Sequence, residues 1–225
     1  MVTIKNTLKQ RWIGLLFGLF FNASGNALSV AGHMGSGVWT ASAVNISGWL
    51  GWPLGTLLFI IGTINAITNQ FLIRRLDIIR LVGEMCFIVF FSTIVQFFTR
   101  WFAAIGVGEL PVVVRVFISA LGIFLFCIGI SLYQRANIVM HPNDDTTNIL
   151  RFLYVHGNAT ISQLIDFMPP IVAITIVFFN TGQIDSVNIA TLFSILGNGF
   201  MIAWSDEHIW PTLKHNFRSN IVADL

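Results

Sequence analysis

The sequence predicts an all-α, polytopic membrane protein with about six transmembrane helices. Hydrophobic residues make up 55% of the 225 residues and charged residues only 10%, whereas roughly 25% of the residues in a soluble domain are charged. The distribution is equally informative, because no Asp, Glu, Lys or Arg occurs between Arg11 and Arg74. Since so little charge cannot cover a water-exposed surface, we expect a single membrane domain over residues 1–225, embedded in a lipid bilayer.

Six stretches are apolar enough to cross a hydrocarbon core of roughly 30 Å, which takes about 20 residues of helix. Helices are expected because an open sheet cannot satisfy its backbone hydrogen bonds in lipid. The fifth stretch is short and contains Pro169-Pro170, which we expect to disrupt its helical hydrogen bonding. The predicted spans are 12–32, 51–72, 79–99, 113–134, 164–181 and 187–205.

The positions of Lys and Arg predict which loops share one side of the membrane. Only Arg100 and Arg115 fall on one side, and ten of the twelve basic residues fall on the other. Because cytoplasmic loops are enriched in Lys and Arg, we expect both termini in the cytoplasm. The ten residues are Lys5, Lys9, Arg11, Arg74, Arg75, Arg80, Arg135, Arg151, Lys214 and Arg218.

Two connections, 32–48 and 140–157, are longer than simple turns. Each follows a glycine-rich apolar helix, opens with helix-breaking residues and continues as a short helix-compatible stretch. The sequence leaves open whether either one re-enters the membrane. Expected helix caps and stops are Ser36 and Gly48 in the first, and Asn143, Asp144, Thr146 and Gly157 in the second.

The chain divides into two similar halves, 12–100 and 113–205. Each half holds three predicted spans, so the odd number places the halves in the membrane with opposite orientation. Inverted repeats of this kind are common in secondary transporters, with the binding site near the bilayer midplane where the repeats meet. The pattern therefore predicts two inverted three-helix repeats and favours transport.

Short motifs across residues 12–205 resemble the YczE/YyaS/YitT group of small bacterial membrane proteins. In that group a glycine–tryptophan motif follows the first helix, and a Gly-Thr pair opens the second. The chain departs from it at Thr40, where members often carry an acidic residue, and at Ala190, where Gly would precede Thr. The resemblance implies a membrane fold in a bacterial cytoplasmic membrane, and little chemistry. The motifs are 35–40 (GSGVWT), 51–56 (GWPLGT), 62–65 (GTIN), 142–145 (PNDD), 188–191 (NIAT) and 197–199 (GNG).

Polar side chains at membrane depth are costly and usually face the bundle interior or a cavity, so they are the best site candidates. Asn22 and Asn26 are four residues apart in the first span and share one helix face. They either line a pocket or form interhelical hydrogen bonds. Asn65 and Asn69 repeat this spacing in the second span, where solvation at the membrane interface is the alternative.

Five residues in or near the two long connections are further candidates. His33 either lines a pocket or is solvated at the interface, and Trp39 is either an aromatic platform or an interfacial anchor. Asp144 and Asp145 act as coupling carboxylates or as helix-capping groups. Asp166 lies three residues before the two prolines, and a carboxylate beside a broken helix is typical of cation-coupled carriers.

Other polar residues complete the candidate set. Glu84 is expected to pair with Arg80, four residues earlier on the same helix. Gln163 lies close to Asp166, and Asn198 lies between two glycines in the last span. The candidate pocket residues are Asn22, Asn26, His33, Trp39, Thr40, Asn65, Asn69, Asp144, Asp145, Gln163, Asp166 and Asn198.

The sequence favours transport over catalysis. It contains no phosphate loop, HExxH, GxSxG or CxxC motif and no histidine with a metal-ligand spacing, so we expect no enzyme, cofactor or metal site, and no nucleic-acid partner. The leading hypothesis is a small permease for a small-molecule solute, alone or as a homodimer. The alternatives are a substrate-binding subunit of an energy-coupling-factor importer, which would dock an ATPase-module partner through Gly18 and Gly25, and a non-transporting accessory protein.

Overall fold

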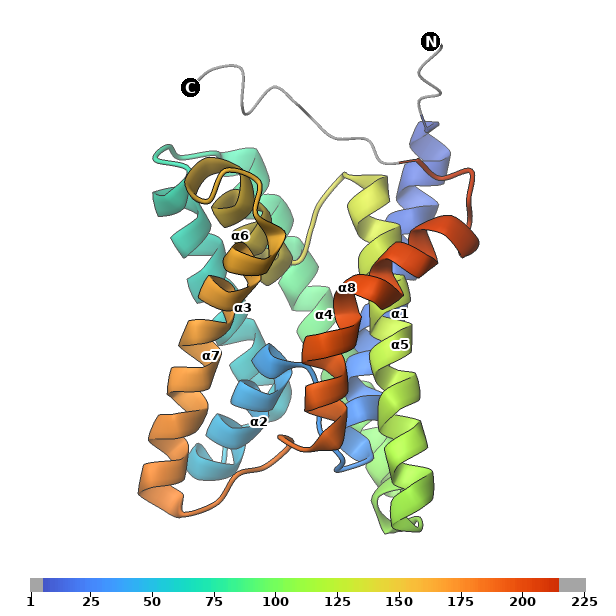
Figure 1. Cartoon of the computed structure of the whole chain (residues 1–225), viewed down its shortest axis with the longest axis vertical. Coiled ribbons are helices and arrows are strands. Elements are labelled where there is room, and N and C mark those ends of the chain that lie inside the picture. The colour runs from blue at the N-terminus through green and yellow to red at the C-terminus, as the bar shows by residue number, and fades with distance from the viewer. Residues whose placement is uncertain (1–5, 215–225) are drawn as a thin grey trace.

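The computed structural model describes residues 6–214, which form an all-α bundle (Figure 1). Lys5 and Arg218, two of the basic residues used to predict orientation, lie outside this range. A short 3-10 turn, Val107–Glu109, and a π-helical turn, Leu150–Tyr154, join the α-helices. The eight α-helices in the described range are α1 (Leu8–Ala31), α2 (Val38–Leu50), α3 (Leu54–Leu72), α4 (Ile78–Ala104), α5 (Val112–Ala136), α6 (Pro142–Ile149), α7 (Ala159–Thr181) and α8 (Ile189–His208).

Within residues 6–214, five helices are long and apolar enough to cross a membrane: α1, α3, α4, α5 and most of α7. They correspond to the first five predicted spans. The sixth predicted span forms α8, which does not join this group because it ends in Ser205, Asp206, Glu207 and His208. The chain is therefore a multi-pass membrane protein.

The centre of the bundle is the contact between α1 and α5, where glycines bring the two backbones together. A Cβ atom on Gly129 would lie 2.6 Å from the carbonyl oxygen of Gly18. A Cβ atom on Gly25 would lie 2.5 Å from the carbonyl oxygen of Gly122. Without a hydrophobic force between helices in lipid, close packing at small residues is a main source of helix association.

The remaining helices pack around this pair in matching ways. Helix α4 packs on α1 and α8 packs on α5, while α2 packs on α7 and α6 packs on α3. The largest difference between the halves concerns one pair of helices in each. Helix α3 packs along α4, whereas α7 and α8 make no comparable contact in the described part of the chain, and Figure 1 shows them on opposite sides of the view.

The first long connection contains the 13-residue helix α2, so the predicted short helix is confirmed. Its bounds differ from the prediction. The N-cap is Gly37 instead of Ser36, and the helix continues past Gly48 to a left-handed C-cap at Gly51, with φ of 71°. Glycine adopts this conformation without steric cost, which makes Gly51 the better stop.

The second long connection contains α6, which starts one residue earlier than any predicted cap. Pro142 is the first helical residue, where its fixed φ favours helix initiation. The N-cap is His141, whose side chain accepts a hydrogen bond from the backbone N–H of Asn143. The α-helix ends at Ile149 and passes into the π-helical turn, before the predicted stop at Gly157. The predicted caps lie inside the helix: Asn143, Asp144 and Thr146.

The two ends of the described chain meet at one end of the bundle. The side chain of Asn6 donates to the carbonyl oxygen of Lys214 at 2.5 Å and accepts from its backbone N–H at 2.9 Å. The connection between α3 and α4 lies at this same end, and that between α4 and α5 lies at the opposite end (Figure 1). The connections before and after α4 thus lie at opposite ends of the bundle, as the predicted order of spans requires.

Arg135, near the end of α5, forms hydrogen bonds with the backbone at and just after the C-terminus of α8. It is only 1% exposed, and its guanidinium donates to the backbone carbonyls of Ile209 at 2.8 Å and Leu213 at 3.0 Å. It also lies 3.2 Å from the Asp206 carboxylate. The last carbonyls of a helix have no intrahelical partner, and the guanidinium also donates to one of them, that of Asp206, at 3.3 Å.

We expect Arg135→Gln to lower the free energy of unfolding by about 3 kcal/mol, because it leaves a carboxylate and several carbonyls without their charged donor. Thermal unfolding of the purified protein in detergent measures this. The matched control is Arg100→Gln at an exposed position of α4, which should change stability by less than about 1 kcal/mol. Equal effects of the two substitutions would contradict the capping role.

Candidate functional site

A cavity of about 280 Å³ lies in the interior of the bundle, and every α-helix of the described range contributes to its lining. A second cavity of about 290 Å³ adjoins it, sharing Gln134, Asn148 and Arg151. This second cavity extends to Asn137 and Asp206, toward the end of the bundle that carries the two chain ends. Small-molecule sites typically have volumes of about 300–1,000 Å³, so the inner cavity suits a small solute.

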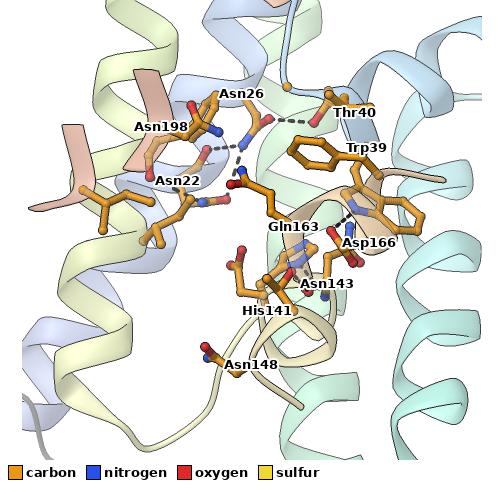
Figure 2. Close-up of a pocket in the computed structure, with 18 of the residues that line it drawn as sticks. Asn22, Asn26, Trp39, Thr40, His141, Asn143, Asn148, Gln163, Asp166 and Asn198 are labelled. Carbon is orange, nitrogen blue, oxygen red and sulfur yellow. Dashed lines mark hydrogen bonds between the residues drawn. The ribbon is translucent and has the colours of Figure 1, made fainter. Parts of the chain in front are cut away.

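The cavity brings together most of the predicted site residues, as Figure 2 shows for several of them. They come from five different helices, so the site exists only in the folded bundle. Their position agrees with the expectation that intramembrane polar groups face an interior space. The predicted residues that line it are Asn22, Asn26, Trp39, Thr40, Asp144, Gln163, Asp166 and Asn198.

A chain of hydrogen bonds crosses the cavity wall between α2 and α6. The hydroxyl of Thr40 donates to Asn26 Oδ1 at 2.6 Å, and Asn26 Nδ2 lies 3.3 Å from Asn22 Oδ1 (Figure 2). Asn22 Nδ2 in turn lies 3.5 Å from the Tyr133 hydroxyl, which donates to the Asp144 carboxylate. The two asparagines predicted on one face of α1 therefore have both proposed roles, as interhelical hydrogen-bonding groups and as cavity lining.

Asp166 is the most deeply buried carboxylate of the cavity lining, at 5% exposure. Its Oδ2 accepts a hydrogen bond from the indole N–H of Trp39 at 2.8 Å (Figure 2). Its Oδ1 is also buried, and no described residue donates a hydrogen bond to it. The Thr147 hydroxyl, which donates to the carbonyl oxygen of Asn143 at 3.2 Å, also lies near enough to the Asp166 carboxylate to interact with it. The cavity lining thus contains a buried carboxylate whose Oδ1 has no donor within hydrogen-bond geometry among the described residues.

Helix α7 does not break at the prolines that follow Asp166. The helix runs from Ala159 to Thr181 with Pro169 and Pro170 inside it, so the predicted broken helix is wrong. Each proline removes one backbone N–H, yet the surrounding turns hold helical geometry, as happens in membrane helices whose neighbours support the chain. The position of Asp166 in the cavity therefore does not depend on an unwound segment.

The N-terminus of α2 also opens onto the cavity, through residues 37–40. The N-cap is Gly37, so within the described range no side chain caps the first turn, and that turn contains no acidic residue. Val38 and Thr40 are each only 5% exposed. The first N–H groups of a helix have no intrahelical partner, and at α2 no described side chain supplies one.

Burial changes the pKa of two ionisable groups at the start of α6, His141 and Asp144, which lie outside the spanning helices. Burial lowers the pKa of His141, which keeps the imidazole neutral, and the ring packs edge-on against Phe91 at 4.6 Å between centroids. Burial raises the pKa of Asp144, and the Tyr133 hydrogen bond opposes that shift. Arg151, which donates to the carbonyl oxygen of Gly157 at 3.0 Å, is the cationic side chain of the described lining.

Two predicted site residues, His33 and Asn65, do not line the cavity. His33 is exposed, has a positive φ of 54° and sits beside Gly108 at the turn after α1. This agrees with the alternative of interfacial solvation. Asn65 is buried and donates to Asn143 Oδ1, so it joins α3 to α6.

Two more predicted site residues form a buried polar network under α6. Asn69 donates to Glu84 Oε1 and to the carbonyl oxygen of Pro142, both at 3.0 Å. Asp145 accepts two hydrogen bonds from the guanidinium of Arg80, each at 2.5 Å. The predicted Arg80–Glu84 ion pair is present at 3.8 Å, but the closer partner of the arginine is Asp145. These groups hold α6 on α3 and α4.

Several lining residues were absent from the predicted set. The α6 region contributes many of them, since Thr147, Asn148 and Arg151 follow the predicted Asp144 at the helical spacing of one face. That periodicity could have been used to predict these residues from the sequence. No sequence signal marked the aromatic lining residues, because phenylalanines occur throughout the spans. The unpredicted residues include Phe91, Phe126, Gln134, His141, Asn143, Thr147, Asn148, Arg151, Ser162 and Phe167.

Comparison with known proteins places the whole bundle within one sequence family. A family model described as a family of unknown function, DUF6198, matches residues 9–207. The match runs from the first turn of α1 to the last turn of α8, so it includes every helix that lines the cavity. No curated protein and no solved structure matches the chain.

Proposed function

We propose that this chain, which belongs to the DUF6198 family of unknown function, is a small permease that moves a small polar solute across the membrane. One observation carries this proposal. A polar cavity lies inside a bundle of apolar, membrane-crossing helices and continues toward one end of the bundle. Polar groups at membrane depth are expensive to maintain and usually mark the pathway of a solute or ion.

The packing of the helices supports two inverted repeats, α1–α4 and α5–α8. Exchanging the halves converts the α1–α4 contact into the α5–α8 contact, and the α2–α7 contact into the α6–α3 contact. The short helices α2 and α6 occupy equivalent places, and both begin at the cavity. Transporters built from inverted repeats bind their substrates at such a junction.

The largest difference in helix contacts between the halves supports alternating access. Helices α3 and α4 pack together, while the cavity lies between α7 and α8. Exchanging the roles of the halves describes a second state, in which α7 closes on α8 and α3 parts from α4. The cavity then opens toward the other end of the bundle. The same sequence thus has a route to both sides of the membrane around one fixed site.

Orientation and setting follow from the loops. We place both termini in the cytoplasm of a bacterial cell, since ten of the twelve basic residues lie on that side, and the motif resemblance to the YczE/YyaS/YitT group agrees with this. The importer-subunit alternative is less well supported, because the small-residue face of Gly18 and Gly25 packs on α5 and is not free to dock an ATPase module. We propose no catalytic role for the cavity.

Reconstitution of the purified protein alone into vesicles tests the permease. We expect solute uptake under an ion gradient without any ATPase, and we expect Gly199→Phe to abolish it. Gly199 lines the cavity and no atom lies within 4 Å of a Cβ placed there, so the ring can fill the space. The control is Leu196→Phe on the outer face of α8, where the side chain is 84% exposed.

Two results would reject the permease. Tight binding without uptake, together with co-purification of an ATPase module, would identify a capture subunit of an importer. Neither binding nor uptake would identify an accessory protein.

A further inference from the structure

We propose that the cavity binds a zwitterionic solute of the amino-acid type, with its ammonium group on Asp166 and its carboxylate at the N-terminus of α2. The inference rests on the proposed function, in which this cavity holds the transported solute. It is carried by two unmatched groups of opposite sign that face the same space.

The first unmatched group is the Asp166 carboxylate. Its Oδ1 is buried and receives no hydrogen bond from any residue in the described range, while its Oδ2 is held by Trp39. A buried charged oxygen without a partner is strongly unfavourable. A bound ammonium group supplies both the missing donor and the compensating charge, and charge-assisted hydrogen bonds of this kind are the strong ones.

The second unmatched group is the first turn of α2. Residues 37–40, which contain the N-cap and this first turn, line the cavity, and the N-cap Gly37 has no side chain to cap the N–H groups. A helix N-terminus carries partial positive charge and binds carboxylates through these groups. The matching helix α6 differs, because its first turn already holds Asp144 and Asp145. Of the two short helices, α2 is therefore the one prepared for an anion.

The two groups are close enough for one small solute. Trp39 lies in the first turn of α2, and its indole N–H reaches Asp166, so the length of a single tryptophan side chain separates the helix end from the carboxylate (Figure 2). The space of about 280 Å³ accommodates a molecule of that length. The rings of Trp39, Phe91 and Phe167 also line the cavity, and aromatic faces attract an ammonium group.

A singly charged solute satisfies only half of this arrangement. A simple cation leaves the α2 amides without an acceptor, and a simple anion leaves Asp166 Oδ1 without a donor. Arg151 adds a positive charge where the two cavities join, which further disfavours a plain cation. A solute carrying both charges is complementary to both ends.

Ligand-dependent thermal stabilisation and equilibrium binding test the proposal on the full chain, purified in detergent. The probes are the proteinogenic amino acids, each at the same concentration. Whichever binds is compared with its methyl ester, which lacks the carboxylate charge, and with its deaminated analogue, which lacks the ammonium group. We expect at least one zwitterion to bind, with a Kd at least tenfold lower than those of both analogues.

Two variants assign the ends separately. Asp166→Asn keeps the shape of the side chain, and we expect it to weaken zwitterion binding at least tenfold while leaving the deaminated analogue unaffected. Gly37→Asp supplies a side-chain cap that competes with the carboxylate, so it should weaken the zwitterion and spare the methyl ester. Gly37→Ala is its control, since the nearest atoms to a Cβ there are Phe126 ring atoms at an ordinary 3.6 Å and Ser194 Oγ at 4.0 Å.

The proposal is overturned if no zwitterion in the panel binds, if an analogue with one charge binds equally well, or if Asp166→Asn leaves zwitterion binding intact. The outcomes that reject the permease differ from those that reject the zwitterion. Zwitterion binding that depends on Asp166, with no uptake into vesicles, rejects transport alone. Uptake of an uncharged or singly charged solute that ignores Asp166→Asn rejects the zwitterion alone.

Discussion

Replacing Gly129 with leucine is expected to separate α1 from α5 and to leave little folded protein in detergent. A Cβ on Gly129 already lies 2.6 Å from the carbonyl oxygen of Gly18, and the obstacle is backbone, which cannot rotate away as a side chain can. Overpacking a close-packed interior typically costs about 1–3 kcal/mol. Here the cost should exceed that range, because the two central helices must move apart along their whole contact.

The readouts for Gly129→Leu are the yield of monodisperse protein by size-exclusion chromatography and the midpoint of thermal unfolding. Gly199→Leu is the matched control, since it places the same side chain where no atom lies within 4 Å of the new Cβ. The control should retain normal yield. A Gly129→Leu protein with wild-type yield and midpoint would show that the α1–α5 contact is not the centre of the fold.

Replacing Arg80 with methionine is expected to lower the free energy of unfolding by about 3–5 kcal/mol, the usual effect of removing one partner of a buried ion pair. The guanidinium donates twice to Asp145, and Glu84 lies beside it. Asp145 is only 3% exposed, so its carboxylate would be left with uncompensated charge in the interior. The α6 helix and the cavity wall it forms should loosen first.

A double-mutant cycle with Asp145→Asn distinguishes the ion pair from simple loss of packing. We expect Asp145→Asn to recover part of the stability lost in Arg80→Met, because it removes the charge that has lost its partner. The surface control is Arg75→Met, whose pairing with Asp77 spans 3.9 Å at a half-exposed side chain and is worth at most about 1 kcal/mol. Strictly additive effects of the two buried substitutions would argue against direct coupling between them.

The spans were predictable because the energetic cost of charge in lipid acts locally along the chain. Residues 12–73 contain no ionic side chain, and the stretches that we identified there form α1 and α3. The same local reasoning failed at α7, where Pro169 and Pro170 predict a break that does not occur. Whether a proline interrupts a membrane helix depends on the neighbouring helices, which are remote in sequence.

The candidate site was predictable only in part, for a similar reason. The cost of a polar group in lipid sends Asn22, Asn26 and Asp166 to the interior, as expected. It does not decide whether an interior polar group faces a cavity or another polar side chain. Asn69 and Asp145 are occupied by partners on other helices, and only the packing of those helices reveals it.

The sequence by itself determined that this protein crosses the membrane several times, and that its loops alternate between the two ends of a bundle. Both follow from hydrophobicity and charge counted along the chain. Only the tertiary structure decided that the uncapped start of α2 and the Asp166 carboxylate share one cavity. Trp39 and Asp166 are 127 residues apart, and their contact depends on how α2 packs against α7, which no local pattern encodes.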